Sequence, residues 1–350
     1  MLRSLSLLAS CICASFTCVT YASPLSLSVS PEGTSYILST PLWTLTGAPI
    51  RVRINNTWLN ASDGSLVLFS SSLWLGDDIW GTFNATTLSW AAASAPTTVL
   101  FETNFLVYAD APAIVFRATY PSGTMQRGSG APVPSVADSD GLAAEFPSFK
   151  MDGGGASLGF LQWAGTMLNM KNDLGPYSGQ WARDTPVALG LESGPVVLFD
   201  VNATASLVFS PANEFMAISA ARSLDGDSLA WGPLGSAEEI PKGFTYDCVA
   251  WFGPGINANM MAWGSALLAR FDKPHNLSKL DFTNTHLGYN TDNGAYYYYS
   301  TGAYANYSVA LAAVNQYALE QGIPYRHILL DSWWCVFVLH FLLLIIGVVH

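Results

Sequence analysis

The sequence is poor in charged residues, and the shortage is greatest for basic ones. Only 11% of its 350 residues are charged, and 14 lysines and arginines stand against 25 acidic residues, giving a net charge of −11. A nucleic-acid-binding surface needs clustered Lys and Arg, so this balance excludes a basic footprint of that kind. We therefore expect no nucleic-acid partner.

Cysteine is also scarce. Of five cysteines, Cys11, Cys13 and Cys18 lie near the N-terminus, and Cys248 and Cys335 are the remaining two. This number excludes a disulfide framework, and neither a C-x-x-C motif nor histidines at metal-ligand spacing are present. We expect no metal and no cofactor.

Hydrophobic and aromatic residues are abundant, at 50% and 13% of the chain. From about Ser23 to Cys248, short segments rich in β-branched and aromatic residues alternate with Gly, Pro, Asn, Asp and Ser clusters every ~8–12 residues, a rhythm typical of a β-sandwich. Three clear strand candidates are residues 65–69, 113–120 and 195–199. We expect a β-sandwich domain over residues 23–254, with residues 122–134 as a long surface loop.

The N-terminus has the pattern of a secretory signal peptide. Arg3 gives a positive start, Leu5 to Val19 is apolar, and small residues follow up to Ala22, so we expect residues 1–22 to be removed. Six Asn-x-Ser/Thr sequons lie beyond this segment: Asn55, Asn60, Asn84, Asn202, Asn276 and Asn306. Together they predict a secreted or lumenal glycoprotein, with lysosome or vacuole included.

The pattern changes after Pro254. Apolar residues now recur on one face of a helix: Ile256, Met260, Trp263, Leu267 and Phe271. We expect a linker helix over residues 255–275, ending near Lys273 because Pro274 cannot continue it.

A βαβ unit is expected over residues 283–334. Residues 285–289 predict a first strand, and residues 325–330 predict a second one that is apolar enough to be buried. Between them a helical stripe ends at Gly322, a good C-cap. The members of this stripe are Tyr307, Leu311, Val314 and Ala318. Residue 331 would then lie at the C-terminal end of a parallel strand, where barrel enzymes carry their chemistry.

Two segments carry a family resemblance. Residues 287–299 (LGYNTDNGAYYYY) and residues 322–334 (GIPYRHILLDSWW) resemble the first two strands and loops of the catalytic barrel in the α-galactosidase and raffinose-synthase-like glycoside hydrolases of family 36 and its clan. Those proteins also have an N-terminal β-sandwich and a connecting helix. The resemblance implies a mainly β chain: a supersandwich-like N-terminal domain, a linker helix, and the incomplete start of a (β/α)8 TIM barrel.

The same resemblance implies a sugar-binding site. It places Asp331 against sugar hydroxyls and Trp334 on the wall of the pocket, with Trp333, Asp292 and Tyr296 as further substrate-binding candidates. A carboxylate accepts charge-assisted hydrogen bonds from hydroxyls, and an indole offers a flat apolar face to a pyranose. Where the clan commonly has a second Asp, this chain has Ser332, which leaves the sugar open.

No catalytic residue is assigned. Glycosidases need two carboxyl groups, about 5–5.5 Å apart for retention and ~6.5–9.5 Å for inversion. The resemblance puts both on later barrel strands, so we expect the family activity to be hydrolysis of α-linked sugars and this chain to be inactive. The alternative is a non-catalytic carbohydrate-binding or structural β-sandwich protein.

Two other motifs have simpler explanations. Residues 155–159 match the G-x-S-x-G nucleophile elbow around Ser157, but a strand is expected after it in place of the required helix, so we interpret the match as chance. Acidic neighbours such as Asp225 and Asp227 could suggest calcium or acid/base pairs, but none has EF-hand spacing. Solvated loop charges are the better interpretation.

The last segment, residues 335–350, is almost entirely apolar. Its length falls short of the ~20 residues of a membrane span, and His340 interrupts it. No small-residue site and polar spacer precede it, as a lipid-anchor signal would require. We favour a sequence that departs from a true barrel here, and expect a membrane partner only if this tail is an anchor.

Overall fold

The computed structural model describes residues 23–126, 141–152, 157–163, 177–188, 193–273, 277–291 and 301–330. The chain is mainly β and divides into two compact units, residues 1–270 and 271–350.

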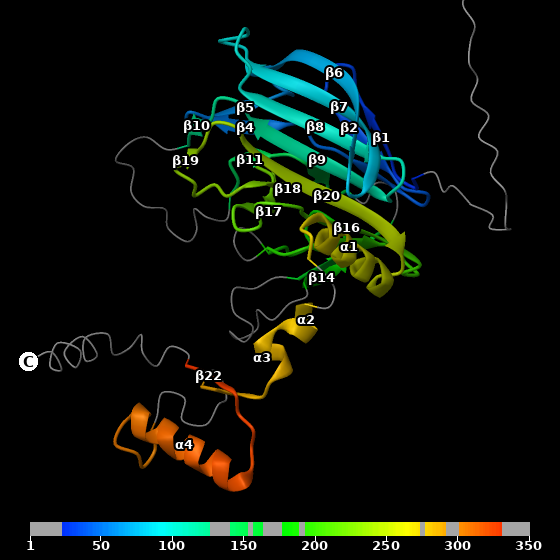
Figure 1. The fold of residues 1–350 in the computed structure, drawn as a ribbon. Coiled ribbons are helices and arrows are strands. Elements are labelled where there is room, and N and C mark those ends of the chain that lie inside the picture. The colour runs from blue at the N-terminus through cyan, green and yellow to red at the C-terminus, as the bar shows by residue number, and fades with distance from the viewer. Residues whose placement is uncertain are drawn as a thin grey trace, which may run out of the picture. The chain divides into compact units, whose positions relative to one another are not determined.

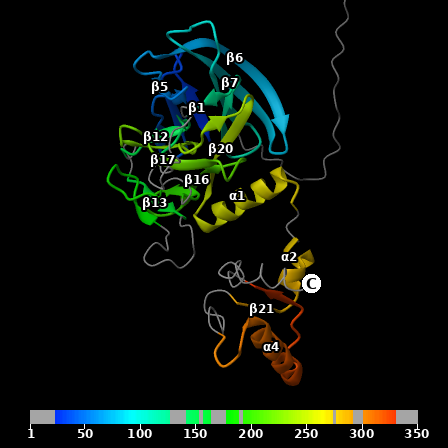
Figure 2. The same ribbon diagram turned by 90° about the vertical axis from the view of Figure 1, so that its left-hand side faces the viewer.

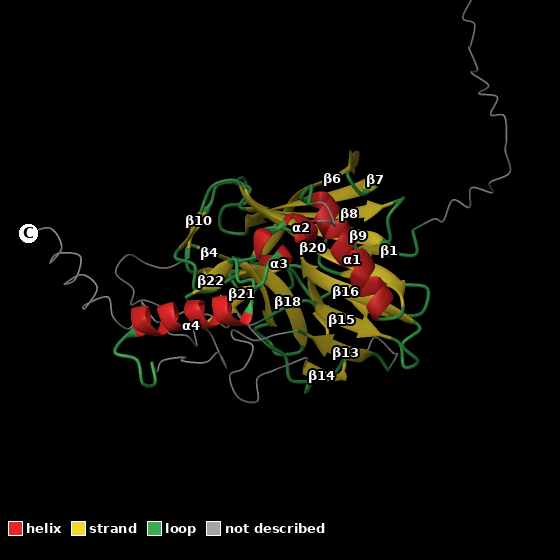
Figure 3. Ribbon diagram, turned by 60° about the horizontal axis from the view of Figure 1, so that its bottom comes forward, coloured by secondary structure: helices red, strands yellow, loops and turns green. Residues whose placement is uncertain are grey.

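A nine-stranded antiparallel sheet forms the centre of the first unit, and Figure 3 shows its strands side by side. In spatial order the strands are β14 (Tyr177–Gln180), β13 (Gly159–Gln162), β15 (Val196–Phe199), β16 (Ala205–Pro211), β20 (Phe244–Pro254), β9 (Ala113–Tyr120), β8 (Phe101–Tyr108), β7 (Gly81–Ala92) and β6 (Leu66–Asp78).

Smaller antiparallel sheets form the facing layer. They are β1 (Ser26–Val29), β2 (Tyr36–Ser39) and β3 (Thr44–Thr46); β11 (Ala144–Glu145), β4 (Arg51–Ile54) and β5 (Thr57–Asn60); β12 (Ser148–Lys150), β18 (Ser228–Pro233) and β17 (Ile218–Arg222); and the pair β10 (Thr124–Met125) and β19 (Glu239–Ile240). A bridge between Gly47 and Phe149 joins the first of these sheets to the third. Gly47 is required there because a Cβ would come within 2.4 Å of the Tyr36 ring.

Aromatic side chains fill the space between the two layers. The Tyr36 ring lies 5.3 Å from Phe105 of the large sheet and 5.6 Å from Phe149 of the facing layer. Its hydroxyl is fully buried, donating to the Ser148 carbonyl and accepting from the Ser148 N–H. Burial raises the pKa of this phenol, so the group stays neutral and hydrogen-bonded.

The central strands of the large sheet are buried on their second face as well. Along β9, Ile114 and Phe116 point into the core between the sheets, whereas Ala113 and Val115 point to the opposite face. There the helix α1 (Asn257–Arg270) packs against β16 and β20, as Figures 1 and 2 show. Burial on both faces explains why β9 is almost continuously apolar.

Polar contacts fix α1 to this face. Asn259 is fully buried, and its Nδ2 donates to the Ser206 carbonyl at 2.9 Å. At the other end of the helix, Arg270 pairs with Asp247 of β20 and lies over the Trp80 ring. Asp247 is 1% exposed and also accepts two hydrogen bonds from Arg117, at 2.7 and 2.9 Å. This carboxylate therefore links β9, β20 and α1.

Within its described residues, the second unit has three helices and one pair of parallel strands. They are α2 (Leu277–Leu280), α3 (Phe282–Thr285), β21 (Gly288–Asn290), α4 (Tyr307–Gln321) and β22 (His327–Leu329). Asn306 caps the N-terminus of α4 by accepting from the Val309 N–H, and Gly322 ends the helix in the left-handed conformation at φ 67°.

The β-sandwich and both long helices expected from the sequence are present, with three local differences. The helix after Pro254 ends at Arg270, because Asp272 takes a positive φ of 50° before Pro274 is reached. Residues 282–285 are helical, since Asp281 caps them, so the first barrel-type strand begins only at Gly288. Within the expected loop at 122–134, Thr124–Met125 form β10, and residues 127–134 lie outside the described part.

The second barrel-type strand is also less buried than its apolar sequence predicted. Ile328, Leu329 and Leu330 are each more than 40% exposed. In the described part of the second unit, β22 pairs with β21 alone, so one edge of β22 is open, and Ile328 and Leu329 are exposed although they point to opposite faces.

Asp247 provides a test of the fold. Asp247→Asn leaves the two guanidinium groups without their shared counter-charge, so we expect the free energy of unfolding to fall by about 3 kcal/mol. Urea denaturation followed by tryptophan fluorescence measures this value. Asp77→Asn, at an exposed position of β6, is the matched control and should change it by less than about 0.5 kcal/mol.

A second prediction concerns solubility. Because the second unit exposes Ile328, Leu329 and Leu330, a chain of residues 24–275 should remain soluble at higher concentration than residues 24–350. Comparing the soluble fractions of the two after identical expression checks this. Equal solubility would contradict it.

Candidate functional site

The two parallel strands of the second unit end at the same edge. β21 pairs with β22 in the register Gly288–His327, Tyr289–Ile328 and Asn290–Leu329. The Thr291 N–H donates to the Leu329 carbonyl at 3.2 Å, and the Thr291 hydroxyl donates to the same oxygen at 3.4 Å. Thr291 is fully buried, so this edge is held from both the backbone and the side chain. The chain leaves this edge at residues 291 and 330.

Close packing at the opposite end of the pair aligns the strands. The Arg326 N–H donates to the Leu287 carbonyl at 2.9 Å. Gly288 lies against the His327 ring, and a Cβ at this glycine would come within 2.1 Å of Nε2. Phe282 stacks on His286 and makes an edge contact with His327, so both histidines contact an aromatic ring.

The five substrate-binding residues predicted from the sequence lie outside the described residues. They are Asp292, Tyr296, Asp331, Trp333 and Trp334. The structure does describe Thr291 and Leu330, the residues that immediately precede Asp292 and Asp331 in the sequence. Thr291 and Leu330 directly follow Asn290 and Leu329, which are paired in the two parallel strands. The sequence predicted that residue 331 would follow a parallel strand in this way.

A cavity of about 340 Å³ lies on the α4 side of β21. Four tyrosines line it together with Ala313, Val314 and Ile323; they are Tyr289, Tyr304, Tyr317 and Tyr325. The rings of Tyr289 and Tyr325 are 5.9 Å apart in an edge contact. This aromatic cavity was not expected from the sequence, because its members come from one strand, one helix and two loops.

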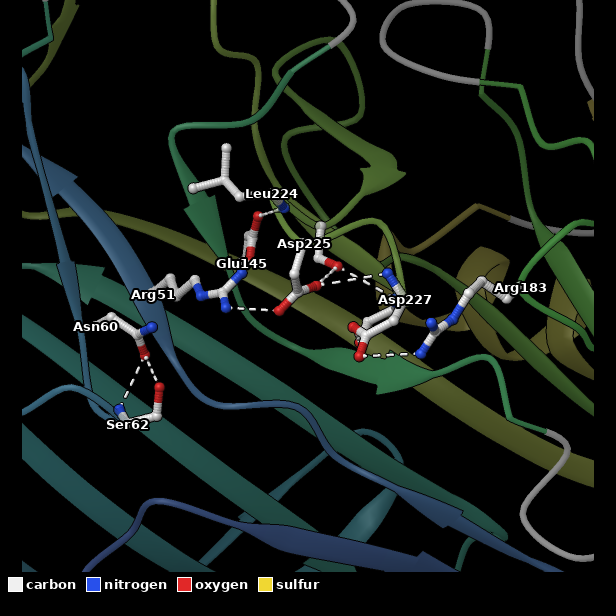
Figure 4. Close-up of polar contacts among 10 residues, drawn as sticks. Arg51, Asn60, Ser62, Glu145, Arg183, Leu224, Asp225 and Asp227 are labelled. Atoms are coloured by element: carbon white, nitrogen blue, oxygen red, sulfur yellow. Dashed lines mark hydrogen bonds and ion pairs between the residues drawn. The ribbon is translucent and has the colours of Figure 1, made fainter.

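Two carboxylates lie close together in the first unit, and Arg51 bridges them (Figure 4). Arg51 Nη1 contacts Glu145 at 3.2 Å, and its Nη2 contacts Asp225 at 2.6 Å. Glu145 also accepts from the Leu224 N–H at 2.7 Å. The cluster therefore ties the β17–β18 turn to β4 and β11.

The two carboxyl groups have shifted pKa values in opposite directions. Burial raises the pKa of Glu145, which is 3% exposed. Partial burial acts in the same sense on Asp225, but hydrogen bonds outweigh it and hold the pKa of Asp225 well below its usual range. The partners are Asp227, Ser223 and Arg51. With Arg51 fixed between the two acids, they form a structural cross-link and not an acid/base pair. Asp225 is exposed in the turn between β17 and β18, as expected of a loop charge, and it is also paired with Arg51.

The remaining sequence motifs are placed as follows. Ser157 is exposed and is followed by the strand β13, so the helix that a nucleophile elbow requires does not follow it. Within the described residues, no group of three His, Cys, Asp or Glu side chains could hold a metal ion. A search of the same residues finds no helix with the length and hydropathy of a membrane span, and the tail at 335–350 lies outside them.

Five of the six sequons lie in the described part. Asn55, Asn84, Asn202 and Asn306 are exposed, whereas Asn60 is half-buried and its Oδ1 accepts from the N–H and hydroxyl of Ser62 (Figure 4). Asn276 lies outside the described residues. Asn306 caps α4 through its Oδ1, so the capping contact does not involve Nδ2, the atom to which an N-linked oligosaccharide is attached.

No protein-family model and no curated protein matches the chain. Among solved structures, it is similar to an alpha-N-acetylgalactosaminidase, NagBb, from Bifidobacterium bifidum in complex with GalNAc, at 8% identity and a TM-score of 0.42 over 71% of this chain. It is also similar to an alpha-galactosidase from Lactobacillus brevis, at 14% identity and a TM-score of 0.43 over 81% of this chain. A GH36 alpha-galactosidase, AgaB, from Geobacillus stearothermophilus gives 9% identity and a TM-score of 0.41 over 88% of this chain. The chain spans 38% of the length of the first two proteins and 50% of the third.

The ion pair of Asp225 generates a pH-dependent prediction. A depressed pKa means that the stabilisation by Asp225 is present at neutral pH and is lost as the pH falls below 3.8, the ordinary value. Asp225→Asn should therefore lower the free energy of unfolding by about 0.5–1 kcal/mol at neutral pH, since the side chain is partly exposed. The difference from the unaltered chain should shrink in acid.

Urea denaturation of both chains at neutral pH and at about pH 2.5 measures this change. Asp77→Asn is again the control. If the free energy of unfolding of Asp225→Asn were lower by the same amount at both pH values, the charge of Asp225 would not contribute to stability.

Proposed function

We propose that this chain is a glycoside hydrolase-like protein of the secretory pathway that binds an α-linked sugar at the carboxyl ends of β21 and β22. One observation carries the proposal: these strands are parallel, adjacent and in register up to Asn290 and Leu329. The next residues on the two strands lead into the loops that begin with Asp292 and Asp331. In barrel enzymes, this end of the strands holds the substrate site.

The residues that follow the strands have suitable chemistry for a sugar. Asp331 would accept hydrogen bonds from two neighbouring hydroxyls, and charge-assisted bonds of this kind are about twice as strong as neutral ones. Trp333 and Trp334 would provide flat apolar faces for the C–H side of a pyranose. Asp292 and Tyr296 would approach the same sugar from the first loop.

The hydrolysis itself is proposed for the whole protein. Hydrolysis of an α-linked sugar needs a general acid and either a nucleophile or a general base, both usually carboxyl groups. The resemblance covers two segments, 287–299 and 322–334, and neither supplies both groups at a barrel strand end. The acid and the nucleophile are therefore left unassigned.

Passage through the secretory pathway is supported by two features of the sequence. Residues 1–22 have the charge and hydropathy pattern of a signal peptide. Four of the sequon asparagines are exposed, as an attached oligosaccharide requires: Asn55, Asn84, Asn202 and Asn306.

A binding measurement tests the sugar site. Asp331→Asn keeps the shape of the side chain but removes its charge, so the affinity for a methyl α-glycoside should fall about tenfold or more. Titration calorimetry with a panel of methyl α-glycosides measures this effect. Asp272→Asn, at an exposed position after α1, is the matched control and should leave the affinity unchanged.

The outcomes separate the two candidate functions. Loss of binding in Asp331→Asn alone supports the proposed site. Sugar binding that is equal in all three chains supports a carbohydrate-binding β-sandwich, and no binding of any glycoside by the unaltered chain contradicts both.

A further inference from the structure

The edge strand β6 exposes large apolar side chains on one face. Leu73 and Leu75 are 82% and 79% exposed, although they point to the same face of the sheet as the core residue Leu88. In the described part of the chain, β6 pairs with β7 alone and so has one free edge (Figure 2). A long strand of this kind is a template for pairing with another chain unless something covers it.

A groove of about 550 Å³ runs along this face. Its apolar lining comes from β1, β6, β7 and β8, and includes Leu27, Leu73 and Val107. Hydroxyl groups are interspersed with these side chains. Within the described residues, the hydroxyls of Ser71, Ser72 and Thr86 make no hydrogen bond. A lining of aliphatic carbons and unused hydroxyls matches the alternating C–H and O–H surface of a sugar.

Asn84 stands at the end of this groove. It lies on β7, directly opposite Leu75 of β6 and Val107 of β8. Residues that are directly opposite in an antiparallel pair share a face, with Cβ atoms about 4.5–5.5 Å apart. Asn84 is exposed, and Thr86, the hydroxyl residue of its sequon, lines the groove on the same face.

We propose that Asn84 carries an N-linked oligosaccharide that lies along this groove and covers the apolar face of β6. The attachment point is next to the exposed leucines, so the first sugar residues reach them without any change in the backbone. The volume of the groove is within the ~300–1,000 Å³ of ordinary ligand sites, which is enough for a few sugar residues. The oligosaccharide prevents a second copy of the chain from pairing along β6.

This inference rests on the proposed secretory route, because only that route attaches the oligosaccharide. Asn202 is the matched control: it is an exposed sequon in the turn between β15 and β16, and Thr204 of its sequon lines a different groove, to which β6 contributes no residue. Removing the oligosaccharide at Asn202 should leave the β6 face unaffected.

The experiment begins with expression of the full chain in a secretory eukaryotic host. Glycopeptide mass spectrometry gives the occupancy of each sequon. Light scattering after size exclusion then gives the average mass of the unaltered chain, of Asn84→Gln and of Asn202→Gln. We expect occupancy at Asn84, and about a doubling or more of the average protein mass in Asn84→Gln alone.

Two further measurements distinguish misfolding from exposure of β6 as the cause of the increased mass. Enzymatic removal of the oligosaccharides from the folded, unaltered chain should cause the same increase in mass. Adding Leu73→Lys and Leu75→Lys to Asn84→Gln should restore the lower mass, because charges on an edge strand oppose pairing.

The possible failures are distinguishable. An absence of oligosaccharide at every sequon overturns the secretory route. Occupancy at other sequons but not at Asn84 overturns this inference alone. Equal masses for Asn84→Gln and Asn202→Gln also overturn it.

Discussion

Burial of the central strands of the nine-stranded sheet on both faces is the constraint on which the first unit depends. The aromatic core around Tyr36 covers one face, and α1 covers the other. A strand in such a sheet cannot leave a charge without partners, and Asp247 meets this condition by accepting from Arg117 and Arg270. The same carboxylate therefore fixes the position of the helix at the end of this unit, from which the chain continues toward β21.

The second unit depends on a smaller set of contacts with a more direct bearing on function. Three pairs of residues and the buried Thr291 hold β21 and β22 in parallel register. Parallel pairing brings together, at one edge, two points of the chain that are 39 residues apart, Thr291 and Leu330. The proposed sugar site needs this register, because acidic and aromatic residues from both loops must reach one sugar ring.

Much of this architecture could be predicted from the sequence, and for stated physical reasons. The strand at 113–120 follows from its β-branched and aromatic content, and the helix at 307–321 follows from an apolar stripe. Gly322 ends the helix as expected of a residue that adopts positive φ easily. The Asp281 cap was missed: its side chain accepts from the N–H groups of Thr283 and Asn284, and the short helix that it caps includes residue 285, where a strand was expected to begin.

Features that join distant parts of the chain could not be predicted. The bridge from Arg51 to Asp225 spans 174 residues, and the tyrosine cavity gathers side chains from separate elements, so neither has a local pattern. The exposure of Ile328 and its neighbours depends on which elements pack against β22, which no spacing within the strand reveals.

Hydrogen–deuterium exchange with and without a bound methyl α-glycoside tests the central claim most directly. The account predicts slower exchange in two peptides at once, one covering residues 287–300 and one covering residues 326–334, with no change in the strands of the first unit. Slower exchange confined to the first unit, or to only one of the two peptides, would contradict a sugar site formed jointly by the ends of β21 and β22.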